Sequence, residues 1–436
     1  MQSTRKERIG WYFYDWANSA FYTTVITVFL GPYLKAITYA AADATGYVYP
    51  LGIPVYYKSF FFYILALSFI CQFFLLPVLG AIADYTNKKK FLLGLFAYLG
   101  SISTMAMYFI EGNSYLLGGG LLLMANVCFG ASIVMYNAYL GELAPPERRD
   151  AVSSIGWAFG YLGGGVVLAA NLILYSQYHI LDISEGDAVR ISISSTGIWW
   201  AVFTIIPMVT LKVRRPIIKI PSGQSIISTG FKQLKATVKD AVNYPKTLFF
   251  LGAYLCYNEG VQVVIVSSVQ FGEDELGLSI ATLTTVILMV QFIAFLGSLL
   301  FNYLAKVFNT KNAILISLVI WTCAVFYAFQ FLYSEAGFYI LGAIIALVLG
   351  GTQALSRSLY SNLIPLGKEA EYFSLYEVSD RGTSLIGPLL FGLALQFTGS
   401  FRIALLSLCV FFIAGFIMLL KVNIPQAMRE ANKTNY

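Results

Sequence analysis

Apolar runs of about twenty residues recur along this 436-residue chain, with only short polar breaks between them. A helix of about twenty residues crosses the ~30 Å hydrocarbon core of a bilayer. With 58% hydrophobic and 11% charged residues, the chain is too apolar for one soluble core. The predicted spans lie near residues 10–36, 58–83, 91–110, 115–140, 152–175, 195–212, 247–270, 278–304, 312–333, 336–360, 372–398 and 402–422. We therefore expect an all-α membrane protein with twelve transmembrane helices.

The distribution of basic residues predicts the orientation, because Lys and Arg are retained on the cytoplasmic side of a membrane. If the N-terminus lies inside, only Lys35, Lys58, Arg190 and Arg402 of the 28 basic residues fall outside. Both termini are therefore predicted to be cytoplasmic. Short loops and the lack of an organelle signal favour a bacterial inner membrane. The net charge of +6 follows from this topology and gives no argument for nucleic acid.

The residues that carry enzyme or metal chemistry are scarce. The five cysteines fall inside predicted spans without paired spacing, and the single histidine, His179, lies in a loop. We expect no metal site, no cofactor and no enzyme activity. A polytopic enzyme acting on lipids, the alternative from another class, would need a cluster of nucleophile, base or metal ligands at an interface loop. The expected partners are a small-molecule substrate and the lipid bilayer, and the expected state is a monomer.

The chain is predicted to contain two related six-helix bundles, residues 1–211 and 247–436, joined by a basic, proline-containing cytoplasmic linker at 212–246. Two pairs of loops support this duplication. The segment "GAIADYTNKKKF" (80–91) matches "NYLAKVFNTKNA" (302–313) at an offset of 222, and "ELAPPERR" (142–149) matches "NLIPLGKE" (362–369) at an offset of 220. Internal repeats of this kind are typical of secondary transporters. The alternative is that short inner loops became similar independently.

The loop "GAIADYTNKKK" resembles the one between the second and third spans of the major facilitator superfamily, commonly written G-x-L-A-D-x-x-G-R/K-R/K. The matching residues are Gly80, Ala83, Asp84, Lys88 and Lys89. Asn87 replaces the second glycine, and the copy in the second half has Lys306 where an acid is often found. The resemblance implies two pseudo-symmetric bundles and a gating role for Asp84. The alternative interpretation of this loop is a plain basic segment that fixes topology, and we prefer it for the lysines.

Within that superfamily, three further segments resemble the vacuolar amino acid effluxer family, whose bacterial members are grouped as the unknown major facilitator family. They are "YDWANSAF" (14–21), "GGTQALSRSLYSNLIP" (350–365) and "EYFSLYEVSDRGTSLIGP" (371–388). Tyr372 and Ser374 depart from the usual Phe-Phe-Gly of that family. The resemblance implies transport by alternating access, with amino acid efflux as the expected activity. The alternative is export of a larger amphipathic solute such as a siderophore, drug or cell-wall fragment.

In the superfamily, the first, fourth, seventh and tenth spans line the cavity. On this sequence they would bring in Asp15, Asn18, Tyr22, Asn126, Asn137, Glu259, Gln262, Gln353 and Arg357. Charges of both signs suit a zwitterion, with arginine for the carboxylate and an acid for the ammonium group. The same charges could instead latch the inner gate, and both interpretations stay open for Asp15 and Arg357.

The expected depth of each charged residue in the membrane divides these residues into two groups. A rise of ~1.5 Å per residue places Arg357 near the cytoplasmic face, at a level similar to that of Glu377, Asp380 and Arg381 in the next span. We expect Glu377, Asp380 and Arg381 to belong to the inner gate. Glu259 lies near mid-bilayer, where desolvation would make it a proton carrier, with Asp15 as the second candidate. The alternative for Glu259 is a protonated side chain hydrogen-bonded to a neighbouring helix.

Two further expectations concern the rims of the molecule. Aromatic residues at predicted span ends, among them Trp11, Trp199 and Trp200, fit anchoring at the membrane interface. The loop at about 37–57 faces outside. A passive insertion is the preferred interpretation of it, and a lid is the alternative.

Overall fold

The computed structural model describes residues 3–214, 244–382 and 386–432, and most of them are helical. In this part of the chain, eleven helices are long and apolar enough to cross a membrane. The expected all-α class is therefore confirmed. The expected span at 372–398 is represented by two helices, α14 (Glu369–Gly382) and α15 (Ile386–Thr398), on either side of residues outside the described part.

The first half of the chain holds six of the membrane-spanning helical stretches. The bounds of its elements are α1 Arg5–Ala20, η1 Phe21–Phe29, α2 Leu30–Ala40, β1 Tyr47–Val48, η2 Pro50–Gly52, β2 Val55–Tyr56, α3 Phe60–Tyr85, α4 Lys89–Ala106, η3 Met107–Phe109, α5 Tyr115–Ala138, α6 Leu140–Leu143, η4 Pro146–Arg148, α7 Arg149–Ser176 and α8 Glu185–Thr210. The segment η1 is a π-helix that continues α1 into α2, so all three form one span, Arg5–Ala40.

The second half has the same build. Besides α14 and α15, its elements are α10 Pro245–Asp274, α11 Ile280–Phe308, α12 Thr310–Gln330, α13 Glu335–Asn362, α16 Phe401–Ser407, α17 Cys409–Lys421 and α18 Ile424–Asn432. The predicted linker at 212–246 falls mostly on 215–243, outside the described residues. The exact division into two units therefore stays a prediction.

The sixth span begins earlier than hydropathy predicts. Its helix starts at Glu185, because the Ser184 hydroxyl accepts a hydrogen bond from the Asp187 backbone N–H and the Asp187 carboxylate accepts one from the Ser184 backbone N–H. Such a capping box satisfies the free N–H groups at a helix start and so allows polar first turns. The hydropathy limit at 195 marks the apolar part of α8 only.

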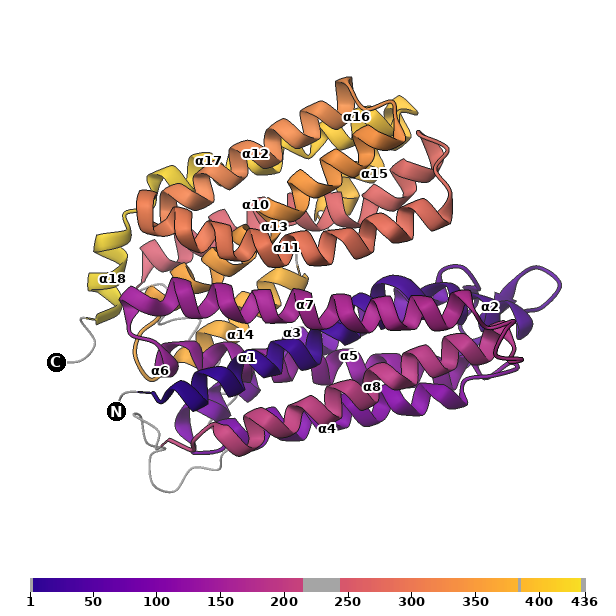
Figure 1. The fold of residues 1–436 in the computed structure, drawn as a ribbon, viewed down its shortest axis with the longest axis horizontal. Helices are drawn as coiled ribbons and strands as arrows, with labels where there is room; N and C mark the ends of the chain where they lie inside the picture. The colour runs from indigo at the N-terminus through magenta and orange to yellow at the C-terminus, as the bar shows by residue number, and fades with distance from the viewer. Residues whose placement is uncertain (1–2, 215–243, 383–385, 433–436) are drawn as a thin grey trace.

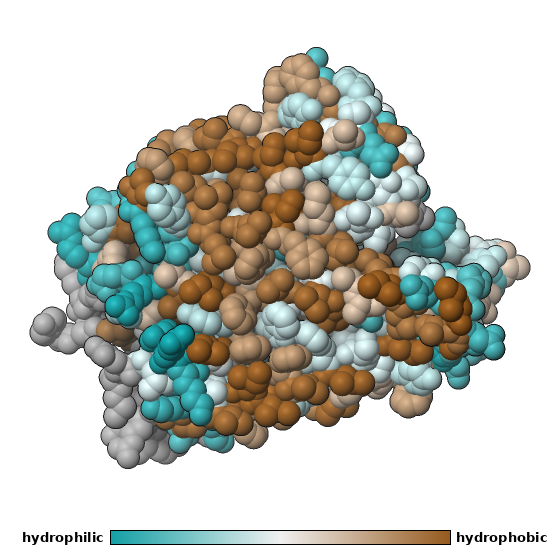
Figure 2. Space-filling view, viewed as in Figure 1, coloured by the Kyte–Doolittle hydropathy of each residue, from teal (hydrophilic) through white to brown (hydrophobic). Residues whose placement is uncertain are grey.

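The two halves meet through a few helices. Helix α7 packs against α11 and α13, and α3 packs against α14, so each half contributes to one shared interface. Figure 1 shows the helices of the two halves lying alongside one another, with both chain ends at the same end of the molecule. The space-filling view shows a broad apolar band flanked by hydrophilic ends, as expected for a surface in contact with lipid (Figure 2).

Two of the predicted interface anchors are buried instead. Trp11 and Trp200 have no exposed surface. The Trp11 ring stacks on Tyr136 at a centroid distance of 4.3 Å, and its indole nitrogen donates to the Tyr136 carbonyl at 2.8 Å. The anchoring prediction is therefore wrong for both residues, because position near a span end does not reveal which way a helix face turns.

Candidate functional site

A cavity of about 370 Å³ lies between the two halves. Its lining along α13 runs from Arg357 to Phe338, near the start of that helix. These positions are 19 residues apart, which corresponds to about 28 Å of helix. Arg357 lies in the part of α13 closer to the chain ends, since α1 begins at that end and the spans alternate in direction. The cavity therefore extends from a charged floor to the opposite end of the helices.

Seven of the eight residues predicted to bind substrate lie in the cavity wall. They are Asp15, Asn18, Tyr22, Asn137, Gln262, Gln353 and Arg357. Their role in binding stays a prediction, but the structure brings them together from four helical spans, as the superfamily resemblance implies.

The structure places Glu259 outside this lining. Its Oε2 atom accepts a hydrogen bond at 2.8 Å from the backbone nitrogen of Gly387, in the first turn of α15. The cavity-facing stripe of α10 holds Tyr254, Gln262, Ile265 and Val269. Glu259 is five positions after Tyr254, about 140° around the helix, so it points to another face. Its depth in the span was the basis of the prediction, and depth does not fix direction.

Asn126 is the second polar residue that faces elsewhere. Its amide donates to the Ser68 hydroxyl of α3 at 2.6 Å, inside the first half. A buried amide needs such a partner, so Asn126 is a packing residue of the helix bundle.

The floor of the cavity is an ion pair between the halves. Arg357 Nη1 lies 3.5 Å from Asp15 Oδ2 and 3.3 Å from Asn137 Oδ1. The Tyr136 hydroxyl donates to Asp15 at 2.8 Å, and the Asn137 amide donates to Glu377 Oε1 at 2.8 Å. Asp15, Arg357 and Glu377 are all buried. The structure therefore places three of the five predicted charges in one network, while the side chains of Asp380 and Arg381 lie outside the described residues.

The cavity wall differs between its two sides. The first half contributes mainly polar and aromatic groups, including Ser19, Thr23, Thr27, Trp157 and Tyr161. The second half contributes mainly aliphatic side chains, among them Ile265, Val286, Ile287, Leu341, Ile345 and Leu349. A solute in this space would meet charges at the floor and an apolar wall beside them.

Asp84 joins the halves between the floor and the chain ends. Its carboxylate accepts hydrogen bonds from the backbone N–H groups of Ala370 and Glu371, at 3.0 and 2.8 Å, in the first turn of α14. A helix N-terminus favours a negative charge, through its free N–H groups and its dipole. This geometry fits a gate contact, and the gating role of Asp84 stays a prediction.

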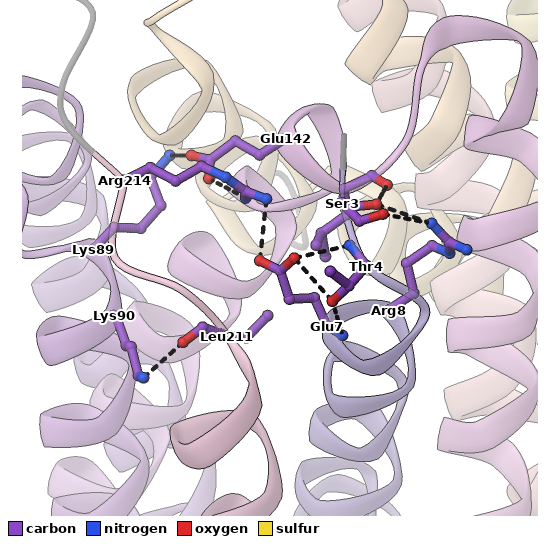
Figure 3. A network of polar contacts seen from close by, with 10 residues as sticks. Ser3, Thr4, Glu7, Arg8, Lys89, Lys90, Glu142, Leu211 and Arg214 are labelled. Carbon is purple, nitrogen blue, oxygen red and sulfur yellow. Dashed lines mark hydrogen bonds and ion pairs between the residues drawn. The ribbon is translucent and has the colours of Figure 1, made fainter. Parts of the chain in front are cut away.

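The lysines after Asp84 have specific partners as well. Lys89 Nζ lies 2.7 Å from Glu142 and 3.6 Å from Asp84, and Lys90 Nζ donates to the Leu211 carbonyl at 2.6 Å. Arg214 binds Glu142 and Glu7 at 2.8 and 3.1 Å (Figure 3). This network binds the start of the linker to α1 and α6. The sequence predicts only a plain basic loop for the lysines, since no local pattern links positions so far apart.

A second contact between the halves involves Arg149 and Asp150 at the start of α7. Arg149 Nη1 donates to the Ser361 carbonyl and to Asn362 Oδ1, at 2.5 and 3.0 Å. Asp150 accepts hydrogen bonds from the hydroxyls of Ser358 and Thr310. Together with Asp84, these residues connect the two halves on the side of the chain ends. The charged run "ERRD" before a span was the sequence signal that could have identified them.

Metal chemistry has no visible basis in the residues described, where no group of three or more His, Cys, Asp or Glu side chains could hold an ion. The arrangement offers a solute a cavity with a charged floor.

Known proteins are similar to this chain in sequence or in fold. The family model described as vacuole effluxer Atg22 like matches residues 3–432. An uncharacterized MFS-type transporter, YxiO, of Bacillus subtilis (strain 168) is 32% identical over 425 residues, which cover 96% of this chain and 95% of the relative. Autophagy-related protein 22 of Coccidioides immitis (strain RS) is 27% identical, covering 99% of this chain and 89% of the relative.

Solved transporters have the same architecture at low sequence identity. The major facilitator transporter FucP in the outward conformation aligns with a TM-score of 0.69 and 15% identity, covering 96% of this chain and 98% of its own. The proton:xylose symporter XylE gives the same TM-score at 12% identity, with 95% and 93% covered. These similarities confirm the expected major facilitator fold.

Proposed function

The chain belongs to the family of Atg22-like vacuole effluxers, transporters of the major facilitator type, and we propose that it exports a small zwitterionic solute, an amino acid. The observation that carries this proposal is the floor of the cavity, where Arg357 of one half and Asp15 of the other lie 3.5 Å apart. An amino acid carries the two complementary charges on groups attached to one carbon, so one solute could engage both side chains at once.

The size and lining of the cavity support this class of solute. Its volume of about 370 Å³ is at the lower end of the ~300–1,000 Å³ typical of small-molecule sites. The aliphatic wall formed by α10, α11 and α13 favours an apolar side chain on the solute. The same wall favours the second candidate, a larger amphipathic solute.

The direction and setting of transport belong to the same proposal. We place both termini in the cytoplasm of a bacterial cell, with the chain a monomer in the inner membrane, because 24 of the 28 basic residues then lie on the cytoplasmic side. The contacts of Asp84, Arg149 and Asp150 would then close the cytoplasmic side, and the cavity would face outward.

Uptake of radiolabelled amino acids into inverted vesicles tests the proposal. Native protein should accumulate label above empty vesicles, and Arg357→Ala should abolish the accumulation. The control is Arg429→Ala, because Arg429 is an exposed arginine on α18. A folded native protein that moves no amino acid, or an Arg357→Ala variant as active as the native chain, contradicts the proposal. Transport of an amphipathic solute without amino acid transport would support the second candidate.

Proton coupling through Glu259 or Asp15 is the last part of the proposed function. Both carboxyl groups are buried between helices, where a change in hydrogen bonding could be linked to protonation. Transport should follow an imposed pH gradient in native vesicles and lose that dependence in Glu259→Gln or Asp15→Asn. Transport that ignores the gradient in the native protein rules out this coupling.

A further inference from the structure

The guanidinium group of Arg357 lies in a recess built by the opposite half of the chain. Its Nε donates to the Ser153 hydroxyl at 2.9 Å and its Nη2 to the Ser153 carbonyl at 2.8 Å, while Nη1 faces Asn137 and Asp15. The polar groups in these contacts come from α1, α5 and α7 of the first half. Arg357 itself comes from α13, so its side chain crosses the interface between the halves.

Three aromatic rings complete the recess. The centre of the guanidinium lies 5.0 Å from the ring centroid of Trp11, 5.4 Å from Tyr136 and 5.2 Å from Trp157. A cation within about 6 Å of such a ring is attracted by its negative face. We define the cation box as Trp11, Asp15, Tyr136, Asn137, Ser153 and Trp157.

A glycine in α7 leaves the space for the cation box. A Cβ atom at Gly156 of α7 would lie 2.7 Å from the Trp11 ring, 2.9 Å from the Tyr136 hydroxyl and 3.0 Å from Arg357 Nη2. The space for a planar cation therefore exists because position 156 has no side chain. The box is rigid as well, since Trp11 is fixed by its stacking on Tyr136 and its hydrogen bond to the Tyr136 carbonyl.

Opening the cavity on the side of the chain ends must withdraw Arg357, because α13 moves with the second half. The vacated box would then hold a buried Asp15 carboxylate and three aromatic faces without a cation. A buried charge without a partner is costly, so another cation should take the place. This step rests on the proposed function, in which the solute brings an ammonium group.

We propose that the cation box is the site for the ammonium group of the substrate, and that Arg357 occupies it as a tethered substitute when the side of the chain ends is closed. The substrate separates the ion pair by joining both partners: its ammonium group enters the box and its carboxylate pairs with the withdrawn Arg357. Binding of substrate and release of the contact between the halves are then one exchange of ion pairs. A solute with only one of the two charges cannot complete the exchange.

The box can be tested without any transport measurement. In Arg357→Ala the box is empty, so added methylguanidinium should bind and raise the Tm, by on the order of 2 °C at saturating concentration. Methylurea, a neutral molecule of similar shape, should give no shift. The native protein, whose box is filled by Arg357 in the closed state, should show no Tm shift with methylguanidinium. The double variant Arg357→Ala/Asp15→Asn should lose most of the response.

A Tm shift of Arg357→Ala with methylguanidinium but not with methylurea supports the cation box. This result does not depend on amino acid transport, so the cation box and the proposed function can fail separately. Equal shifts with methylurea, or no shift in a folded Arg357→Ala variant, overturn it. If Arg357→Ala does not fold, inhibition of the native transporter by methylguanidinium from the side of the chain ends replaces the assay. Trp157→Leu should relieve that inhibition at least several-fold, whereas Trp199→Leu, which removes a ring stacked on Trp16, should not. Equal behaviour of the two variants overturns the proposal.

Discussion

The carboxylate of Asp84, near the end of α3, lies 2.8 Å from the backbone nitrogen of Glu371 in the first turn of α14. The two residues belong to different halves of the chain. The contact therefore has to break whenever the halves separate on the side of the chain ends, and its strength sets part of the balance between the closed and open states.

Asp84→Asn should weaken this closure. Asparagine keeps one acceptor but loses the negative charge that the helix N-terminus favours. The closed state should therefore lose about 1–2 kcal/mol of stability, which shifts the equilibrium about 5–30-fold toward the open state. The reporter is Ser361→Cys in a chain without its five native cysteines. Ser361 is buried on α13, and its hydroxyl has no partner among the described residues. The thiol should react faster with a polar reagent, and turnover should change more than KM. Asp182→Asn, in the loop between α7 and α8 away from the chain ends, is the control and should leave labelling unchanged.

Asp150 should matter to closure in a similar way. The offset of 222 that relates the two loops leads from Asp84 to Lys306, so the second half has no matching acid. The start of α12 is bound instead by Asp150 of the first half, which accepts from Thr310 at 2.5 Å. Asp150→Ala should increase labelling of the same reporter by several-fold, because both hydroxyl contacts are lost. Glu147→Ala removes an exposed acid three residues earlier. Equal effects of the two variants would show that Asp150 acts only through its charge near the membrane surface.

Gly350 and Gly297 should prove essential for the packing of α11 on α13. A Cβ at Gly350 would lie 2.2 Å from the Ala294 carbonyl, and one at Gly297 would lie 2.2 Å from the Leu347 carbonyl. Backbone cannot yield as a side chain does, so Gly350→Ala should destabilise the protein by about 1–3 kcal/mol. Gly120→Ala, at a helical position with nothing within 4 Å, is the matched control. It should be neutral or slightly stabilising, because alanine favours helix. Thermal unfolding in detergent compares the two, and a similar Tm for both variants would contradict the packing argument.

The contrast between Gln262 and Glu259 shows how far sequence analysis reaches. Hydropathy and charge distribution predict the spans and the depth of each polar residue, because a helix must cross a fixed thickness of lipid. They do not predict direction around the helix axis. Gln262 lies in the cavity wall and Glu259 bonds to Gly387, although both are near the middle of one span.

The partners of Arg357 show the second limit. The sequence predicts Asp15 and Arg357 as charges of one cavity or gate, and the structure places them 3.5 Å apart. The contributions of Ser153 and Trp157 depend on the packing of α7 against α13, which brings together residues about two hundred positions apart. Neither residue belongs to the matched segments, so the resemblance to a family could not identify them.

The loop after α2, on the side away from the chain ends, offers a test at acidic pH. Asp43 accepts hydrogen bonds from the Thr45 hydroxyl at 2.6 Å, from the Thr45 and Tyr47 amides at 2.8 and 3.0 Å and from the Tyr49 hydroxyl at 2.8 Å. The Thr45 hydroxyl first, and then the other donors, lower the pKa of Asp43 below its usual value. A carboxylate with a lowered pKa in the folded state stabilises the loop above its ordinary pKa, near 3.9, and this stabilisation is lost as the pH falls further.

Hydrogen exchange should therefore show Thr45 and Tyr47 amides that are protected at about pH 6 and lose protection progressively below about pH 4, after correction for intrinsic rates. Asp43→Asn should be less protected at about pH 6, because an uncharged acceptor binds these donors more weakly, and it should show little change with pH. The loop lies far from the chain ends, at the other side of the membrane, so the Ser361→Cys reporter should not respond to this variant. Native amides whose protection stays constant down to about pH 3 would mean that Asp43 does not hold the turn.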